Sequence, residues 1–458
     1  MAWIINDCII LIFLLSLCYC YLKQRRDGLV LLSIVGYCCM PVLRIGETGF
    51  NSAYCITAIL VCFAIIELVK TGWKLQKLQL LYGAFMVGAI FVTTLGWLLN
   101  GEPKGADIVH FFGLAQYVLG VLCLSIFIKK IPDDSQRWRI MVYGIGIITA
   151  INMVFTVIQF ASFTLGCDIL SVLYAYPGKQ GPLNDMMEVQ YFSRAFGASY
   201  SPLVLASIVL LSCGLIMGQV NQPFRWKWIL LFGMTLMLGF LAFSKTVMLG
   251  ILILLAVFTV CLVASSQRRR LLRRVAPYVI ATVAVAVLAA VIAIAIGLKS
   301  QVTYYYGYYL NPLKAFDSRY GNLTNTEDSE SDATDVPDSE GTGNMADVSD
   351  IIAEHPIIGV GPAPVKGEFL GDSQIMTVLH DGGILAAVCY GVCYLWLFIC
   401  FIRKNEYSRA LVIVGLAIAC VSIPVLTYGL SIPFVAYCLS AEAQERKKRQ
   451  PVHLGGAR

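Results

Sequence analysis

The chain has 458 residues, of which 58% are hydrophobic and only 14% are charged, and its mean hydropathy is +0.74. This composition excludes a soluble domain of this size. Apolar runs of roughly 17–25 residues recur along the whole length, which is typical of membrane-spanning helices. No cysteine pair is spaced like zinc ligands, and of the sixteen cysteines only Cys167 lies near an outer loop, so the other fifteen are interpreted as small apolar residues of the spans.

The first apolar run begins at Trp3 and lacks a basic n-region and a small-residue cleavage site, so we expect a retained span. The last run contains Pro424 and Pro433 and is either one tilted helix or a short broken hairpin. A hairpin would keep the basic tail inside, and would give about thirteen crossings with the N-terminus outside. The predicted spans are 3–22, 29–45, 51–69, 78–99, 108–128, 140–165, 200–220, 228–243, 246–264, 275–297, 383–402 and 410–439.

The net charge of +6 is explained by topology. Of the 34 basic residues, 25 lie in alternate loops, which marks those loops as cytoplasmic. The fold class predicted is therefore an all-α polytopic integral membrane protein with about 12–13 transmembrane helices and one large periplasmic loop. Its parts are a transmembrane region 1–298 with an outer loop 166–199, the large loop 299–382 with an acidic insert 325–350, and C-terminal helices with a basic tail, 383–458.

The acidic insert has nine acidic residues and no basic one, a composition typical of a solvated, loosely ordered segment. It lacks the spacing of a calcium-binding loop, so no metal site is predicted. The inner loops are short and contain no P-loop or dinucleotide fingerprint. We therefore expect no cofactor and no nucleic-acid partner.

Cations are scarce on the predicted outer face. Arg194 lies in SRAFGAS before a span, Lys245 in the short turn FSKT, and Arg319 in FDSRYG at the start of the large loop. Gathered together, two arginines and a lysine would bind a diphosphate or an acidic sugar at headgroup depth, because guanidinium forks match phosphate oxygens. The alternative is that each side chain snorkels to the interface without a ligand.

The end of the large loop carries the remaining candidate residues. In AEHPIIGVG, Pro356 restrains the chain after His355, and Gly359 and Gly361 permit tight turns or a close backbone approach. In GDSQIMTVLHDGGILA, Asp372 and His380 are eight residues apart and would share one face of a helix. Either could deprotonate a sugar hydroxyl. The alternative is that Asp372 caps the helix and His380 is merely interfacial.

Four polar residues lie in or near predicted spans, which makes them functional candidates. They are too few and too scattered for an ion or proton path, which counts against a transporter. These residues are Asp7, His110, Gln116 and Asn152.

These motifs, in this order, resemble the O-antigen ligase and polymerase superfamily, which comprises Wzy-type polysaccharide polymerases and lipopolysaccharide O-antigen ligases. The resemblance covers roughly 193–386 and rests on SRAFGASYSPLVLA, FSKTVMLG, DSRYG, HPIIGVG and DSQIMTVLHDGGILA. Two departures stand out. The ligase branch has a His-Asn where this chain has Asp372 and Ser373, and the acidic insert separates Arg319 from HPIIGVG.

The resemblance implies a GT-C-like fold in a bacterial inner membrane with the active site facing the periplasm. It implies a metal-independent glycosyltransferase that polymerises undecaprenyl-diphosphate-linked oligosaccharide for O-antigen, capsule or exopolysaccharide, with a chain-length regulator as a further partner. Arg194 and Arg319 would bind the diphosphate with help from Lys245, and Asp372 or His380 would activate the acceptor hydroxyl. The alternatives are an O-antigen ligase, disfavoured by Asp372–Ser373, and a lipid-linked oligosaccharide flippase, disfavoured because the cations lie in loops.

Overall fold

The computed structural model is a bundle of helices, and its described residues carry most of the predicted spans. Arg319, Asp372 and the acidic insert 325–350 lie outside the described residues. The described residues are 2–39, 41–45, 48–72, 75–101, 108–165, 194–199, 201–219, 226–264, 271–299, 302–303, 351–362, 373–421, 425 and 429–441.

Eight helices in the described part are long and apolar enough to cross a membrane, which confirms a polytopic, helical membrane protein. Shorter apolar helices pack among them. The helices are α1 (Ala2–Leu22), α2 (Arg26–Cys39), α3 (Ser52–Thr71), α4 (Lys77–Leu99), α5 (Ile108–Lys129), α6 (Asp134–Leu165), α9 (Pro202–Met217), α10 (Trp226–Leu241), α11 (Lys245–Ala264), α12 (Leu271–Ala295), α16 (Gln374–Arg403), α17 (Tyr407–Cys420) and α18 (Ile432–Leu439), with 3-10 turns η3 (Gly197–Ser199) and η6 (Gly429–Ser431).

The span predicted over 29–45 is shorter in the structure. Helix α2 ends at Cys39, and Pro41 follows, a residue that cannot continue the helix. The chain then forms an antiparallel hairpin of β1 (Val42–Ile45) and β2 (Thr48–Asn51). The Asn51 side chain accepts a hydrogen bond from the N–H of Ala53 at 3.0 Å and so caps α3.

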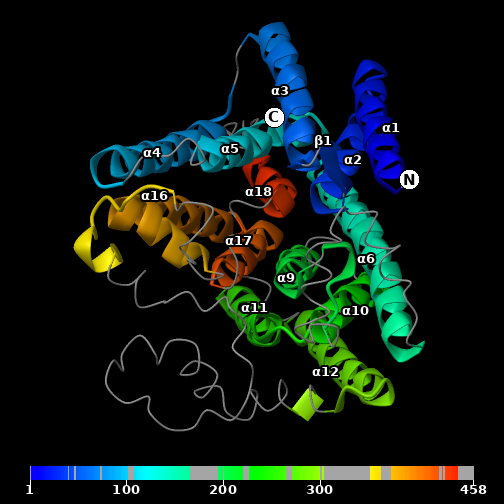
Figure 1. Cartoon of the computed structure of the whole chain (residues 1–458). Coiled ribbons are helices and arrows are strands. Elements are labelled where there is room, and N and C mark those ends of the chain that lie inside the picture. Colours follow the sequence, from blue (N-terminus) through cyan, green and yellow to red (C-terminus); the bar gives the residue numbers. More distant parts are fainter. Residues whose placement is uncertain are drawn as a thin grey trace, which may run out of the picture.

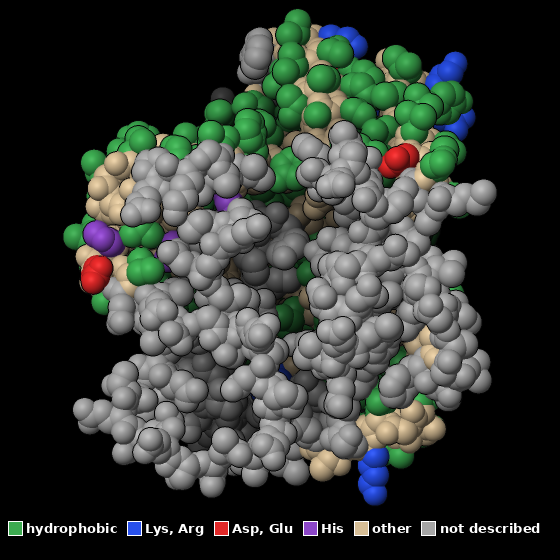
Figure 2. Space-filling view, in the orientation of Figure 1, with side chains coloured by type: hydrophobic (Ala, Val, Ile, Leu, Met, Phe, Trp, Pro, Cys, Tyr) green, Lys and Arg blue, Asp and Glu red, His purple; other side chains and the backbone are tan. Residues whose placement is uncertain are grey.

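The centre of the bundle is α9, in which every residue except Leu203 is buried. Helices α10, α11 and α17 pack around it, and α16 lies along α4 (Figure 1). The outer helices instead expose large apolar side chains, such as Leu11 (58% exposed) on α1 and Val283 (60%) on α12. Hydrophobic side chains cover much of the described surface, with Lys and Arg at its margins (Figure 2). Such a surface suits a lipid environment.

Contacts between connecting segments divide the described helix ends into two sets. This division agrees with the alternation of basic and non-basic loops. At the basic end, segments near 26, 67, 130–139, 215–218, 278, 406–409 and 440 contact one another. At the other end, Asn100 contacts 351–362, and Arg194 contacts the turn between α10 and α11. We call these the inner and outer ends, following the positive-inside expectation.

The last predicted span, 410–439, is broken as the hairpin alternative required. Helix α17 has 14 residues, and α18 runs back to the inner end. The return is fixed by Arg409, whose Nε donates to the carbonyl of Tyr437 at 3.3 Å. The start of α17 thus meets the end of α18, and both lie at the inner end.

Candidate functional site

Helix α16 is broken at Gly383, which has φ 61° and ψ −164°. The break lies at residue 383, where the span predicted over 383–402 begins. Residues 374–382, which the sequence assigned to the large loop, form the first turns of α16. A break in a helix leaves backbone N–H and C=O groups without helical partners. Segment 351–362 supplies partners. The N–H groups of Val360 and Gly361 donate to the carbonyls of His380 and Asp381 (both 2.9 Å), and those of Ile384 and Leu385 donate to the carbonyls of Pro356 (2.8 Å) and Ile357 (3.1 Å).

The residues predicted to shape this loop lie in this cap. Gly359 and Gly361 have φ values of 74° and 88°, and a Cβ added at Gly359 would lie 2.4 Å from the carbonyl oxygen of His380. Only glycine fits such an approach without displacement. Half-buried His355 accepts the N–H of Gly359 on its carbonyl at 3.0 Å, and Pro356 is exposed. These four residues therefore hold 351–362 against α16.

The end of α4 provides the other wall of the cap. Asn100 donates from Nδ2 to the carbonyl of Gly359 at 2.8 Å. The α4 backbone comes close because Gly96 has no side chain, since an added Cβ would lie 2.7 Å from the carbonyl oxygen of Ile358. Asn100 was not among the residues singled out from the sequence. Only its position at the end of an apolar run hinted at a role.

The break in α16 presents a histidine–carboxylate pair. His380 is buried, with 1% of its side chain exposed, and its Nδ1 lies 2.9 Å from Oδ1 of Asp381, whose side chain is 14% exposed. His380 is thus enclosed by protein and paired with a carboxylate, whichever depth in the membrane it takes. A carboxylate bound to Nδ1 fixes the orientation and tautomer of the imidazole. Asp372, expected to share a face with His380, lies outside the described residues.

Arg194 and Lys245 are held near one turn. The Nε of half-buried Arg194 donates to the carbonyl of Ala242 at 3.0 Å, and the N–H of Ala195 donates to the carbonyl of Leu241 at 2.9 Å. Ala242 belongs to the turn between α10 and α11, and half-buried Lys245 is the first residue of α11. Two of the three predicted cations thus lie on adjoining segments. The third, Arg319, lies outside the described residues.

Two amide side chains of α6 position the Arg194 segment. Gln159 donates from Nε2 to the carbonyl of Arg194 at 2.7 Å and accepts the N–H of Phe196 at 3.3 Å. Asn152, 1% exposed, accepts the N–H of Ala198 at 3.0 Å. The sequence marked Asn152 only as a polar residue in a span, and Gln159 not at all. Both residues satisfy buried backbone groups of an irregular segment, as membrane-embedded loops require.

An apolar groove connects the helices that carry the two clusters. It encloses about 670 Å³ and is lined by α11, α16 and α17. Its α16 wall includes Gln374 and Val378, in the same turns as His380, and its α11 wall is Ile253, which follows Lys245 by about 12 Å of helix. Ile375 and Leu395 on its rim are 48% and 59% exposed. The groove is thus accessible from the side on which lipid lies.

The chain matches no protein-family model and no curated protein sequence. Within the described residues, no group of three or more His, Cys, Asp and Glu side chains is placed to hold a metal ion.

Proposed function

We propose that this chain is a membrane glycosyltransferase that polymerises undecaprenyl-diphosphate-linked oligosaccharide repeat units at the outer end of its helix bundle. The observation that carries the proposal is the His380–Asp381 pair at the break in α16, under the cap 351–362 and beside the apolar groove. The motif resemblance supplies the reaction class. The periplasmic face and the GT-C-like fold are parts of the same proposal.

In the proposed reaction, a hydroxyl of the acceptor sugar attacks the anomeric carbon of the donor sugar. A new C–O bond forms, the bond to the diphosphate breaks, and the diphosphate leaves with the bonding electrons. The partly exposed carboxylate of Asp381 accepts the hydroxyl proton, and buried His380 holds that carboxylate in place. Asp372 is the alternative acceptor of this proton.

Arg194, Lys245 and Arg319 are assigned to the departing diphosphate. Cations placed where negative charge develops stabilise a transition state strongly, because they need no rearrangement during the reaction. Supporting this assignment, Gln159 and Asn152 hold the Arg194 segment against α6, and Arg194 itself contacts the turn that precedes Lys245. The apolar groove, whose volume is within the usual range for ligand sites, would hold part of the polyprenyl chain.

The test is to incubate the purified protein with synthetic undecaprenyl-diphosphate repeat unit alone. A ladder of products is the expected result. Product that requires added lipid A–core would replace the proposal with a ligase. Absence of product together with scrambling of the lipid in vesicles would replace it with a flippase.

Variants then test the roles. Arg194→Ala, Lys245→Ala and Arg319→Ala should each reduce ladder formation by about 100-fold or more, the cost of losing one preorganised charge contact. Lys299→Ala is the matched control, since it removes an exposed lysine at the outer end of α12. Normal ladders from the Arg194 and Arg319 variants would refute the diphosphate assignment.

A further inference from the structure

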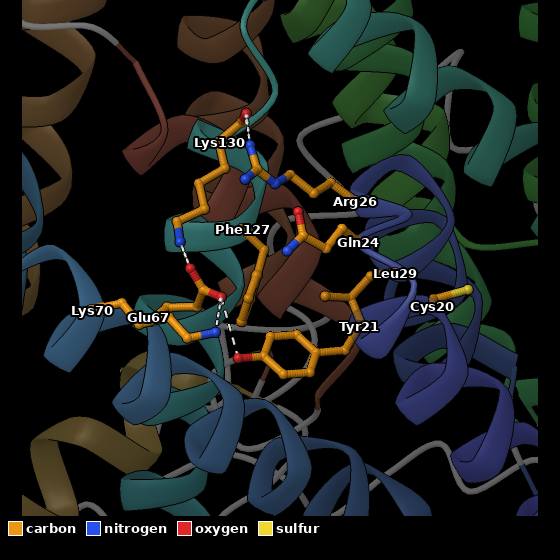
Figure 3. A pocket seen from close by; sticks show the side chains of 9 residues that line it. All are labelled: Cys20, Tyr21, Gln24, Arg26, Leu29, Glu67, Lys70, Phe127 and Lys130. Atoms are coloured by element: carbon orange, nitrogen blue, oxygen red, sulfur yellow. Dashed lines mark hydrogen bonds and ion pairs between the residues drawn. The ribbon is translucent and has the colours of Figure 1, made fainter.

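A polar cavity lies at the inner end of the bundle, away from the residues of the candidate site. It encloses about 210 Å³ between the ends of α1, α3 and α5 and the start of α2. Figure 3 shows Lys130, Glu67 and Tyr21 along one wall, with Arg26 reaching toward Lys130 from the other side. Three regions that are distant in sequence meet here, at 20–29, 67–70 and 127–130, and each adjoins a basic loop.

The charges around the cavity do not balance. Arg26, Lys70 and Lys130 line it, and Glu67 is the only acidic residue among the lining residues, all of which are described. Glu67 forms an ion pair with Lys130, lies 3.9 Å from Nζ of Lys70, and accepts the hydroxyl of Tyr21 at 3.2 Å. The lining thus contains one carboxylate and three cations, an excess of two positive charges.

Arg26 is held next to Lys130 although both are cations. Its Nη1 donates to the backbone carbonyl of Lys130 at 3.2 Å. Burial lowers the pKa of the Lys130 ammonium, and the positive charge of Arg26 lowers it further. Glu67 compensates the charge of Lys130, so a further anion would offset the charges of Arg26 and Lys70.

Gln24, also in the lining, ends α1 in the left-handed conformation, with φ 52°. Its N–H donates to the carbonyl of Tyr21 at 3.0 Å and the N–H of Arg25 donates to the carbonyl of Cys20 at 2.8 Å, which is a common helix C-cap. In Figure 3 the Gln24 side chain points into the cavity, between Arg26 and Phe127. The turn that ends α1 thus places an amide beside the cations of the lining.

The surroundings favour a ligand carried by lipid. Helices α1 and α3, which border the cavity, expose Leu22 (77%) and Val69 (62%) near their inner ends. Acyl chains can pack there while a headgroup enters the cavity. Basic pockets between transmembrane helices at the cytoplasmic side bind phosphate-bearing headgroups, and a guanidinium with two ammonium groups suits a phosphate.

We propose that the cavity bordered by Arg26, Lys70 and Lys130 is a binding site for the phosphate group of an anionic lipid headgroup in the inner leaflet. The site is independent of the glycosyltransferase proposal, because it shares no residue with it. It would anchor α1, α2, α3 and α5 at one lipid.

The test is native mass spectrometry of the full chain in detergent, titrated with phosphatidylglycerol, phosphatidylcholine or inorganic phosphate. Retention of phosphatidylglycerol over phosphatidylcholine is expected. Displacement of phosphatidylglycerol by millimolar inorganic phosphate would overturn the lipid source and identify a soluble phosphate as the ligand. Equal retention of the two lipids, without phosphate binding, would overturn the site.

Variants locate the binding. Lys70→Gln should weaken phosphatidylglycerol binding about five-fold, and Arg26→Gln with Lys130→Gln about 25-fold, since each basic residue near the surface contributes a similar attraction. Glu67→Gln should strengthen binding several-fold, because it removes the competing carboxylate. A cavity that merely braces the fold would give the opposite result, a less stable protein without tighter binding. Arg403→Gln, an exposed cation at the inner end of α16, is the control and should change nothing.

Discussion

The two ends of the bundle hold their polar groups by different means. At the outer end, backbone groups and amides do the holding: four backbone hydrogen bonds dock 351–362 on α16, and Gln159 fixes the Arg194 segment. At the inner end, ion pairs between side chains hold the segments together; Arg409, for example, pairs with Asp134 and Glu406. In the proposed function the charged groups of the outer end act in the chemistry, whereas at the inner end Arg409, Asp134 and Glu406 hold the fold. Variants should accordingly divide into those that lower activity and those that lower stability.

The largest effect expected at the outer end is on activity. Asp381→Asn keeps the shape of the side chain but removes the proton acceptor, so polymerisation should fall by about 10²–10⁴-fold. Because backbone groups hold this region, the unfolding midpoint in SDS should change little. Asp372→Asn is the companion variant. If it lowers the rate and Asp381→Asn does not, the base is Asp372 and the pair at the break is structural.

The largest effect on stability is expected at the inner end. The Arg409 side chain is 2% exposed, and its guanidinium donates to both Asp134 and Glu406. Asp134→Asn combined with Glu406→Gln leaves a buried charge without its counter-charges, which should cost about 3–5 kcal/mol. SDS-driven unfolding followed by circular dichroism measures this. The residual folded protein should polymerise at the normal rate, and a loss of rate without a loss of stability would contradict the division of roles.

At the outer end, a substitution that disturbs the backbone should lower stability more than one that changes an exposed side chain. An alanine at Gly383 would have to adopt φ 61°, and its Cβ would lie 2.5 Å from the carbonyl carbon and oxygen of Ile357. Gly383→Ala should therefore cost about 3 kcal/mol, the upper range for a strained residue. Gly391→Ala in the same helix is the control, because its Cβ meets no atom within 4 Å. Equal stability of the two variants would show that the break in α16 is not required.

The sequence predicted the spans well because bilayer thickness imposes a length and a polarity on each helix. It failed where a structure depends on contacts between distant residues. Arg409 and Asp134 are 275 positions apart, and no local pattern pairs them. The break at Gly383 is set by the docked segment 351–362, not by local sequence alone, and the hairpin after α2 was mistaken for the end of a span because Val42, Leu43 and Ile45 are apolar.

The candidate site was predictable only in its residue types. Arg194 and Lys245 stood out because outer cations are rare, and HPIIGVG because its glycines permit unusual turns. Gln159 gave no such signal, since a single glutamine in an apolar run has no preferred role. Helix periodicity placed Asp372 on the face of His380, a prediction that lies outside the described residues, and it did not predict the contact that the neighbouring Asp381 makes with the imidazole.

Gln159 offers a finer test of how the outer end is held. Gln159→Leu leaves the N–H of Phe196 and the carbonyl of Arg194 without their amide partner, which should cost about 1–3 kcal/mol. Arg194 would also lose its fixed position, so the ladder should shorten. Gln136→Leu, on the exposed inner side of α6, serves as the control for stability. Lost stability with an unchanged ladder would mean that the Arg194 segment is held for folding alone.

The smallest expected effect on stability is at Lys70, in the cavity bordered by Arg26, Lys70 and Lys130. Lys70 is 61% exposed and only 3.9 Å from Glu67, so solvent screens the pair, and Lys70→Gln should lower stability by less than about 1 kcal/mol. The same variant should weaken phosphatidylglycerol binding, as argued above. Unfolding in SDS, measured with and without that lipid, tests both statements together. If Lys70→Gln lowers the free energy of unfolding by well over about 1 kcal/mol without lipid, Lys70 belongs with Arg409 among the charges that hold the fold. If phosphatidylglycerol stabilises the protein and Lys70→Gln reduces that stabilisation, the charges of this cavity face a ligand.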